Sequence, residues 1–453
     1  TFHACFMQLR HLVYKGGHAG YKCNRFFERI GTSTIEESEK SRLTGEVHFL
    51  RAMFYFEMVK RYGGVILLDK VLTMEDNWEI PRSSEKECYD FILDDLKKAT
   101  EMLPASYGSR EKGRATKGAA YALKSRVELY DKRYEDVIKS CAEVYKLGYE
   151  LVDGTTPEKY RSIWWTTNKD NKEIIFDIQY KSPDVYNNMM VCNMVTYIND
   201  KYGDRGWGGL GPTQELVDAF EMADGSPATQ YSQAPADQVF DINTCGIYEG
   251  REPRFYANIV FHGSQIFFNA DKGAVTVDRY LMDTPDKGDG SLTGYNVWKW
   301  IDYDNYNYPY AGASSPDFST NWIILRYAEI YLNDAEARLE TGDVEGARKA
   351  VNVIRQRVGL PALTESDPAK LRELIRKERR IEFAFEEQRF YDVRRWKVGP
   401  ETQTTLHGVR FVSPTEFKIT KTDIRTWNDR LYLTPIPHDE IVRSSVLTQN
   451  PGY

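Results

Sequence analysis

The chain has 453 residues, of which 41% are apolar, so it can bury the core of one large domain or two smaller ones. Its net charge is −7, and its Lys and Arg residues alternate with Asp and Glu, which argues against nucleic acid or anionic lipid as a partner. Its apolar runs fall far short of the roughly 18 residues that cross a bilayer, so no membrane-spanning segment is predicted.

Three stretches of the chain have helical character, at about residues 35–62, 84–148 and 321–396. The first ends at a glycine pair suited to a left-handed C-cap. The second opens with Ser84 and Glu87 in capping-box spacing and contains two short helices joined by a tight turn.

The second and third stretches repeat one another with a shift of 210 residues, so that Leu129 matches Leu339 and Val137 matches Ala347. Each copy has the pattern of a helix–turn–helix with small residues at the expected contacts, as in a tetratricopeptide-like unit. Such units cannot bury their apolar faces alone, so several must pack together. The sequence therefore predicts a mainly α fold built on a platform of helix pairs.

Residues 149–320 differ from the helical stretches because they are rich in Gly, Pro, Asn, Asp and aromatic residues. EIIFDIQY is the clear strand candidate, and most of the remainder has the composition of long loops, which are uncommon in a compact domain unless they have a function. We expect residues 1–148 and 321–453 to form the helical platform. Residues 149–320 would form an irregular, partly β, ligand-binding lobe integrated with it.

Motifs for catalysis or metal binding are absent from the sequence. It has no H-E-x-x-H pair, nucleophile elbow or Walker loop, and its six cysteines lie far apart, as expected of small buried side chains. The acidic turn DTPDKGDG (283–290) could hold calcium but lacks EF-hand spacing. We therefore predict no catalytic residue, no metal and no cofactor.

Several stretches resemble the SusD/RagB family of bacterial outer-membrane nutrient-binding proteins. Residues 376–397, RKERRIEFAFEEQRFYDVRRWK, are similar to its signature helix, and residues 45–67, GEVHFLRAMFYFEMVKRYGGVIL, to its first signature. WIILRYAEIYLNDAEARLETGD and LYLTPIPHDEIVRSSVLTQNPGY match as well. The matches follow the family's order over nearly the whole chain.

The resemblance implies tetratricopeptide-like helix pairs carrying an irregular lobe. It also implies a lipid-anchored protein facing the cell surface, which acts as a lid on a SusC-like TonB-dependent transporter and binds glycans, or peptides in some members. The lipobox and the long segment that usually precede the first signature are not found here. The anchor, expected upstream of this chain in the outer membrane, is therefore implied by the family alone.

Glu378, Glu382 and Glu386 lie at four-residue steps in the signature helix, among several arginines. A glycosidase needs a carboxylic acid with a raised pKa facing a second carboxylate, whereas guanidinium neighbours lower a carboxylate's pKa. We interpret this helix as an ion-pair lattice, with Phe383, Phe385 and Trp396 packed inward.

Residues 295–310, YNVWKWIDYDNYNYPY, include seven Tyr and Trp among amides and carboxylates. An aromatic ring covers the flat C–H face of a sugar at low entropic cost, and polar neighbours can bind its hydroxyl groups. We expect half of these rings to pack in the core and two or three to face a ligand. The residues predicted to bind glycan here are Trp300, Tyr303, Asn305, Tyr306, Tyr308 and Tyr310.

Two further candidates lie near the first helical stretch. Trp78, in the polar loop TMEDNWEIP, has little intrinsic reason to be there unless it binds a ligand or packs against the protein. Arg61, just before the glycine pair, could contact a ligand or form an ion pair at the helix end.

The predicted function is a non-enzymatic surface protein that captures oligosaccharide or polysaccharide and passes it to the transporter. Three alternatives stay open: a peptide-binding member of the same family, a glycoside hydrolase, and a helical-repeat scaffold for other proteins.

Overall fold

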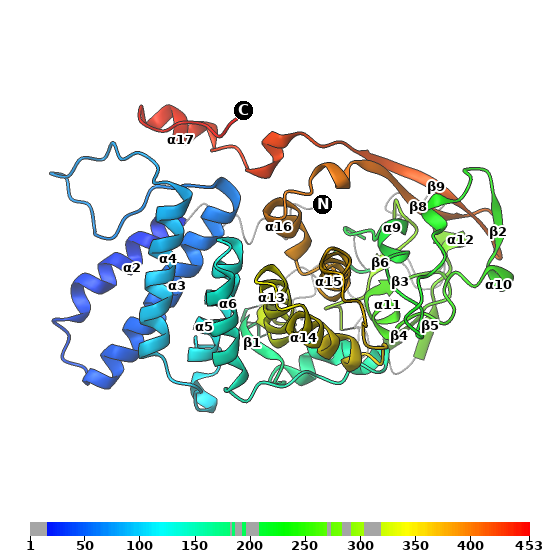
Figure 1. Ribbon diagram of the computed structural model, residues 1–453, viewed down its shortest axis with the longest axis horizontal. Coiled ribbons are helices and arrows are strands. Elements are labelled where there is room, and N and C mark those ends of the chain that lie inside the picture. Colours follow the sequence, from blue (N-terminus) through cyan, green and yellow to red (C-terminus); the bar gives the residue numbers. More distant parts are fainter. Residues whose placement is uncertain are drawn as a thin grey trace.

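The computed structural model describes residues 16–181, 184–185, 193–195, 208–269, 273–282, 291–302 and 319–453. Figure 1 shows helices α2 to α6 side by side at one end, α13 to α16 in the middle, and most of the short strands at the other end. The C-terminal part of the chain runs along one edge, from β9 to α17. The mainly α fold predicted from the sequence is confirmed.

The first helices are α2 (Gly16–Ile30), α3 (Glu37–Tyr62), α4 (Glu85–Met102), α5 (Lys117–Tyr130) and α6 (Tyr134–Tyr145). The predicted capping box is present: the Ser84 hydroxyl accepts from the Glu87 amide, and the Glu87 carboxylate accepts from the Ser84 amide. Helix α3 ends at Gly63, whose φ of 71° favours glycine.

The predicted repeat is confirmed by α13 (Tyr327–Glu340) and α14 (Val344–Arg357). Helix α13 begins and ends 210 residues after α5, and α14 begins 210 residues after α6. Alanines at the contacts, such as Ala119 and Ala335, are fully buried, which lets the helices approach closely.

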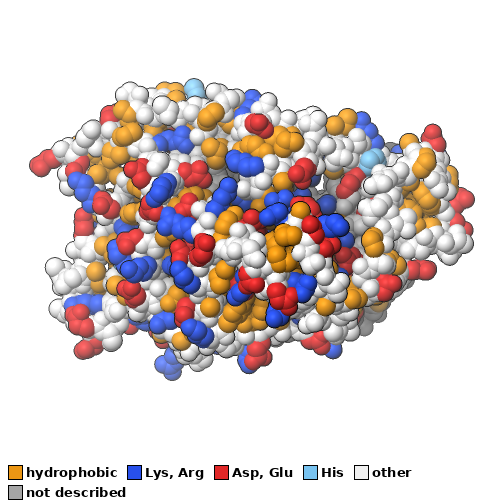
Figure 2. Space-filling view, in the orientation of Figure 1, with side chains coloured by type: hydrophobic (Ala, Val, Ile, Leu, Met, Phe, Trp, Pro, Cys, Tyr) orange, Lys and Arg blue, Asp and Glu red, His pale blue; other side chains and the backbone are white. Residues whose placement is uncertain are grey.

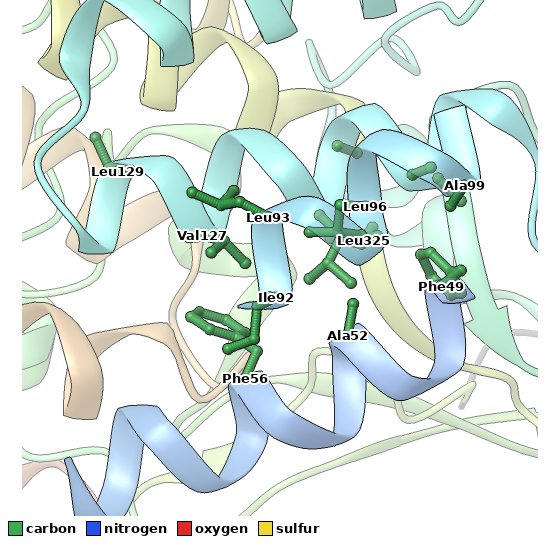
Figure 3. Packing of buried hydrophobic residues seen from close by; sticks show 14 of the residues in the cluster. Phe49, Ala52, Phe56, Ile92, Leu93, Leu96, Ala99, Val127, Leu129 and Leu325 are labelled. Atoms are coloured by element: carbon green, nitrogen blue, oxygen red, sulfur yellow. The ribbon is translucent and has the colours of Figure 1, made fainter. Parts of the chain in front are cut away.

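The core of the helical end is made by α3, α4 and α5, whose side chains interdigitate in Figure 3. Phe49 and Phe56 from α3 pack with Ile92 and Leu96 from α4, and Val127 from α5 completes the layer. All five are essentially inaccessible to solvent. Deep burial of this kind supplies most of the stability of helices that cannot persist alone.

The strands form small antiparallel sheets that join distant parts of the chain. They are β1 (Ile174–Ile178), β2 (Val239–Asp241), β3 (Ile259–Val260), β4 (Gln265–Asn269), β5 (Gly273–Thr276), β6 (Asn296–Val297), β7 (Trp322–Arg326), β8 (Thr404–Phe411) and β9 (Glu416–Arg425). β1 pairs with β7, β3 with β6, β4 with β5, and β9 lies between β2 and β8. The expectation that helix begins at about residue 321 is wrong, because WIILR pairs with β1.

The signature region forms two helices where one was expected, α15 (Pro368–Glu382) and α16 (Gln388–Arg395). Between them Phe385 and Glu387 have φ values of 66° and 62°, in the left-handed region that ends a helix. The remaining short helices are α7 (Pro157–Arg161), α9 (Gln214–Val217), α10 (Ile242–Cys245), α11 (Pro253–Asn258), α12 (Arg279–Met282) and α17 (His438–Arg443).

Candidate functional site

The loop between α3 and α4, which we call the Trp78 loop (residues 64–84), projects from the helical end of the molecule (Figure 1). Trp78 is 61% exposed and Met74 is 92% exposed. A large indole facing solvent is unusual, because burying it against the protein would be favourable. Most of the Trp78 ring is therefore open to solvent, and its role in ligand binding stays a prediction.

The tip of the Trp78 loop is held by hydrogen bonds within the loop. Trp78 Nε1 donates to the carbonyl oxygen of Thr73 at 3.0 Å. The Asp76 carboxylate accepts from the Thr73 amide at 2.8 Å and from the Lys70 ammonium at 2.5 Å. The Lys70 and Thr73 donors lower the pKa of Asp76 to about 2. The indole N–H is thus satisfied by the protein, and the ring presents its apolar surface to solvent.

The neck of the loop is closed by a backbone hydrogen bond from Ser83 N to Val65 O, 2.9 Å long. Gly64 lies so close to Ser83 that a Cβ at this position would be 2.0 Å from the Ser83 carbonyl oxygen. On another side, Asn24 Nδ2 from α2 donates to Leu68 O at 2.9 Å. The loop therefore leaves the helices in a defined direction.

Arg82 ties the neck to the C-terminal segment. Its guanidinium donates to the carbonyl oxygens of Gly64 (2.7 Å), Tyr62 (2.6 Å) and Thr448 (3.0 Å) and to Asn450 Oδ1 (2.9 Å). Because these acceptors come from two segments far apart in the sequence, one side chain fixes both.

Arg82→Gln is expected to loosen the Trp78 loop without unfolding the protein. Loss of charge-assisted hydrogen bonds costs about 1.5–3 kcal/mol, so amide hydrogen exchange over residues 69–80 should quicken by about tenfold or more. Arg443→Gln is the matched control, since Arg443 is an exposed arginine in the same C-terminal segment and pairs with the exposed Glu440 at 3.4 Å. Equal exchange in the two variants would contradict the role given to Arg82.

Arg61 lies in the interior, where only 7% of it is exposed. Its Nε donates to the Tyr391 hydroxyl at 2.7 Å, and its Nη2 lies 3.4 Å from Glu57 Oε2. This position matches the ion pair at the helix end considered for Arg61. It does not match direct contact with a ligand, because the guanidinium is enclosed between α3 and α16.

Trp300 is only 5% exposed, contrary to the expectation that its ring faces a ligand. Its Nε1 donates to the Phe385 carbonyl oxygen at 3.1 Å, and its ring packs edge-to-face against Trp322. The break between α15 and α16 frees this carbonyl, and the indole satisfies it. Tyr295 and Trp298 are also buried, in agreement with the share of rings assigned to the core. The other residues predicted from this stretch lie outside the described residues: Tyr303, Asn305, Tyr306, Tyr308 and Tyr310.

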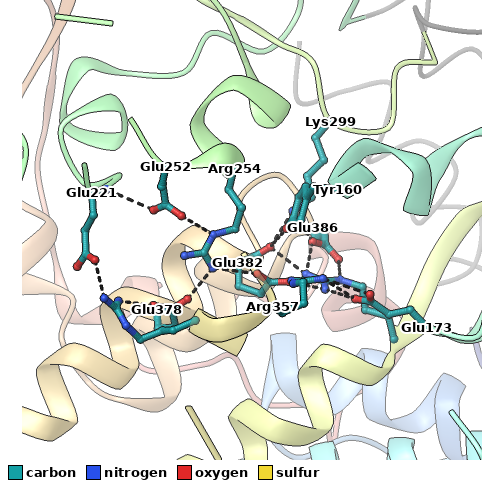
Figure 4. A network of polar contacts seen from close by, with 12 residues as sticks. Tyr160, Glu173, Glu221, Glu252, Arg254, Lys299, Arg357, Glu378, Glu382 and Glu386 are labelled. Carbon is teal, nitrogen blue, oxygen red and sulfur yellow. Dashed lines mark hydrogen bonds and ion pairs between the residues drawn. The ribbon is translucent and has the colours of Figure 1, made fainter. Parts of the chain in front are cut away.

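The ion-pair lattice predicted around the signature glutamates is confirmed (Figure 4). Glu382 is fully buried and accepts from Arg254 at 2.9 Å, from Arg326 at 2.6 Å and from Arg357. Burial on its own raises the pKa of Glu382, but the charges of Arg357, Arg326, Arg254 and Lys299 outweigh it and hold the pKa well below its ordinary value. An enclosed, ionised carboxylate of this kind is a poor general acid.

Lys299, from the aromatic stretch, joins the same lattice. Its Nζ lies 2.6 Å from Glu386 Oε1 and donates to Glu382 O at 2.7 Å. Burial lowers the pKa of Lys299 to about 8, against the opposing effect of Glu386. Part of the aromatic stretch is thus attached to the end of α15 and to the break that follows it.

The described residues include no cluster of three or more His, Cys, Asp and Glu side chains arranged to hold a metal ion. Cys23, Cys88 and Cys141 are buried free thiols, as predicted, and Cys245 is partly exposed. The acidic turn at 283–290 and the remaining cysteines, Cys5 and Cys192, lie outside the described residues. In the part of the chain that the structure describes, each helix is too short or too polar to span a bilayer.

Two family models match the chain. The model described as the SusD family matches residues 172–453, and a model described as starch-binding associating with outer membrane matches residues 13–129. The chain belongs to the SusD family, as its motifs indicated.

A solved SusD-like protein from Bacteroides fragilis NCTC 9343 is 96% identical, with a TM-score of 0.92 over 96% of this chain and 84% of that chain. SusD-like protein P2 of Formosa agariphila is 25% identical over 448 residues, which are 95% of this chain and 78% of that relative. Starch-binding protein SusD of Bacteroides thetaiotaomicron is 25% identical over 363 residues, covering 72% and 60% of the two chains.

Proposed function

We propose that this protein captures oligosaccharides or polysaccharides without transforming them, and that Trp78 is a stacking surface for sugar rings. The observation that carries this proposal is the exposed indole, fixed by its N–H bond to Thr73 and by the closed neck of its loop. The starch-binding description of one family model and of a curated relative supports a glycan as the ligand.

The expected affinity of a single stacked ring is low. Covering roughly 100 Å² of sugar C–H surface contributes about 2.5 kcal/mol, and part of this is lost in ordering the ligand. Because the Trp78 loop is already held by its own hydrogen bonds, little further entropy is lost by the protein. Weak binding of this kind suits capture and release better than storage.

In this proposal the cargo passes to a SusC-like TonB-dependent transporter of the outer membrane. A lipid anchor upstream of the present sequence would hold the protein at the cell surface. The family description that refers to the outer membrane supports this location. Co-purification of the full-length protein with such a transporter from solubilised outer membranes is the direct test.

Trp78→Ala is expected to weaken binding of a neutral oligosaccharide by at least tenfold, because the variant loses most of the stacking surface. Isothermal titration with a panel that includes starch fragments measures this change. Tyr21→Ala, which removes a 37%-exposed ring from α2, should bind like the unaltered protein. If the protein binds peptides but none of the glycans, the peptide-binding alternative is favoured. If incubation shortens the oligosaccharides, the hydrolase alternative is favoured.

A further inference from the structure

A second surface carries three arginines that form no ion pair with any of the described residues. Arg380 lies on α15, Arg389 on α16 and Arg425 at the end of β9. Arg380 and Arg389 are partly buried, and Arg425 is exposed. We call these three residues the arginine cluster. Over the face of the molecule shown in Figure 2, Lys and Arg side chains are interspersed with Asp and Glu side chains.

Contacts through α9 and β8 bring the three elements together. Arg380 Nη2 donates to the Glu215 carbonyl oxygen at 3.2 Å. The Glu215 carboxylate accepts from His407 on β8, 2.7 Å from Nδ1. Arg425 is opposite Thr404 in the β8–β9 register, at the same end of the hairpin. These contacts connect Arg380 to the hairpin that carries Arg425, and Arg389 lies near both, because its charge acts on Arg380 and that of Arg425 acts on it.

The positive charge of the cluster is poorly balanced. Throughout the ranges that the structure describes, the side chains of Arg389 and Arg425 make no hydrogen bond or ion pair, and Arg380 bonds only a carbonyl oxygen. The nearby Asp392 is occupied by Arg379 and Arg395, at 2.9 and 2.8 Å. Of the acidic groups that act on Arg389, this leaves Glu401 as the remaining counter-charge.

The pKa values of Arg380 and Arg389 are both lowered, in agreement with crowding of like charges. Burial, followed by the charges of Arg389 and Arg425, lowers the pKa of Arg380 to about 10, against the opposing effects of Glu215 and Asp218. Burial also lowers the pKa of Arg389, and Arg376 and Arg425 add to this, while Asp392 and Glu401 oppose it. A bound anion would relieve the repulsion and the loss of hydration together.

Two aromatic residues lie close in sequence to the unpaired arginines. Phe390, which follows Arg389, is 38% exposed, and Trp427 lies two residues after Arg425. The Arg394 guanidinium lies 3.3 Å from the centre of the Phe390 ring and 5.7 Å from that of Trp427, so both rings lie near Arg394. The exposed part of Phe390 is available to contact a sugar.

We propose that the arginine cluster is a second ligand site, which binds the carboxylate or sulfate group of an acidic saccharide while Phe390 and Trp427 contact the sugar. Guanidinium groups bind both anions through paired, charge-assisted hydrogen bonds. With a net charge of −7, the protein as a whole repels acidic glycans, so such a ligand requires a local cationic site of this kind. The inference rests on the proposed glycan-binding function.

The test compares arginine variants with matched controls of equal charge. Arg389→Gln/Arg425→Gln is expected to lose at least tenfold in affinity for trigalacturonate, a carboxylate probe, or for a sulfated carrageenan oligosaccharide. Binding of starch fragments should stay unchanged. Arg110→Gln/Arg443→Gln alters two exposed arginines elsewhere and should bind all probes normally. Arg389→Lys/Arg425→Lys keeps the charge but not the paired donors, so it should lose less affinity for the acidic probes than the glutamine variant. Added salt should weaken the binding of the acidic probes and leave that of starch fragments unchanged.

Each other outcome overturns the inference. Equal binding of acidic probes by the glutamine variant and the unaltered protein would show that the cluster is not the site. Equal losses in the control pair would indicate a general effect of charge. If the protein binds polyglutamate but no acidic saccharide, the partner of the cluster would be an acidic protein segment. If starch fragments bind and acidic saccharides do not, the second site fails alone; if no saccharide binds, the proposed function fails with it.

Discussion

Glu382→Gln is expected to lower the free energy of unfolding by about 3–5 kcal/mol, the usual cost of removing one partner from a buried ion pair. Glu382 is fully buried and neutralises charge from Arg254, Arg326 and Arg357. The neutral amide would leave these guanidinium groups enclosed without their common acceptor. Since the three arginines come from α11, β7 and α14, the loss should weaken the contacts that hold these elements to α15.

The pKa of Glu382 also predicts how the free energy of unfolding depends on pH. Its pKa in the folded protein is lowered well below the ordinary value of 4.5, so its contribution is complete above that value. As the pH falls below 4.5 toward the lowered pKa, the contribution is lost. The difference in stability between the unaltered protein and Glu382→Gln should therefore be constant near neutral pH and shrink in acid.

Urea unfolding followed by circular dichroism, repeated from pH 7 down to the acid limit of solubility, measures both effects. Glu373→Gln is the control, because Glu373 is exposed on the same helix and forms a surface pair with Arg376, at 3.2 Å. We expect little change in this control. If Glu382→Gln lowers the free energy of unfolding at neutral pH no more than the control does, the structural role of the ion-pair lattice is contradicted.

Gly64→Ala is expected to open the neck of the Trp78 loop. An added methyl group would lie 2.0 Å from the Ser83 carbonyl oxygen, a backbone atom that cannot rotate away. Forcing atoms into such a packed position costs about 1–3 kcal/mol or more. The displacement would separate Ser83 from Val65, so both protein stability and glycan affinity should fall.

Gly108→Ala is a suitable control for this variant. A Cβ on Gly108 would meet nothing within 4 Å, and its φ of −67° suits any residue. Hydrogen exchange over residues 69–80 and titration with starch fragments distinguish the two variants. If Gly64→Ala keeps the slow exchange and the affinity of the control, the neck does not hold the loop in place.

Local signals in the sequence were sufficient for much of the platform. The Ser84–Glu87 capping box and the repeated helix pairs depend on residues close together in the chain, so their patterns predict them directly. The strand at residues 322–326 was missed because its pairing with β1, far away in the sequence, decides its conformation. Its apolar residues alone do not distinguish a short strand from the start of a buried helix.

The candidate site was predicted in part. Trp78 could be identified as a large ring in a polar loop. The hydrogen bonds of Arg82 to the C-terminal segment and the exposure of Met74 were not predicted, because neither has a local signal in the sequence. The acidic side of the lattice could be identified from its spacing, whereas Arg254 and Arg326 come from distant elements. The direction of Trp300 depends on the carbonyl freed at Phe385, which only the folded structure reveals.

The hydrogen bonds between Arg82 and the C-terminal segment have a consequence for biosynthesis. The two acceptors, Thr448 and Asn450, are 366 and 368 residues further along the chain. While the chain is still emerging from the ribosome, Trp78 is present long before these two acceptors of Arg82. One attachment of the Trp78 loop is therefore completed late in synthesis, and an N-terminal fragment would keep the hydrogen bonds within the loop but lack this attachment.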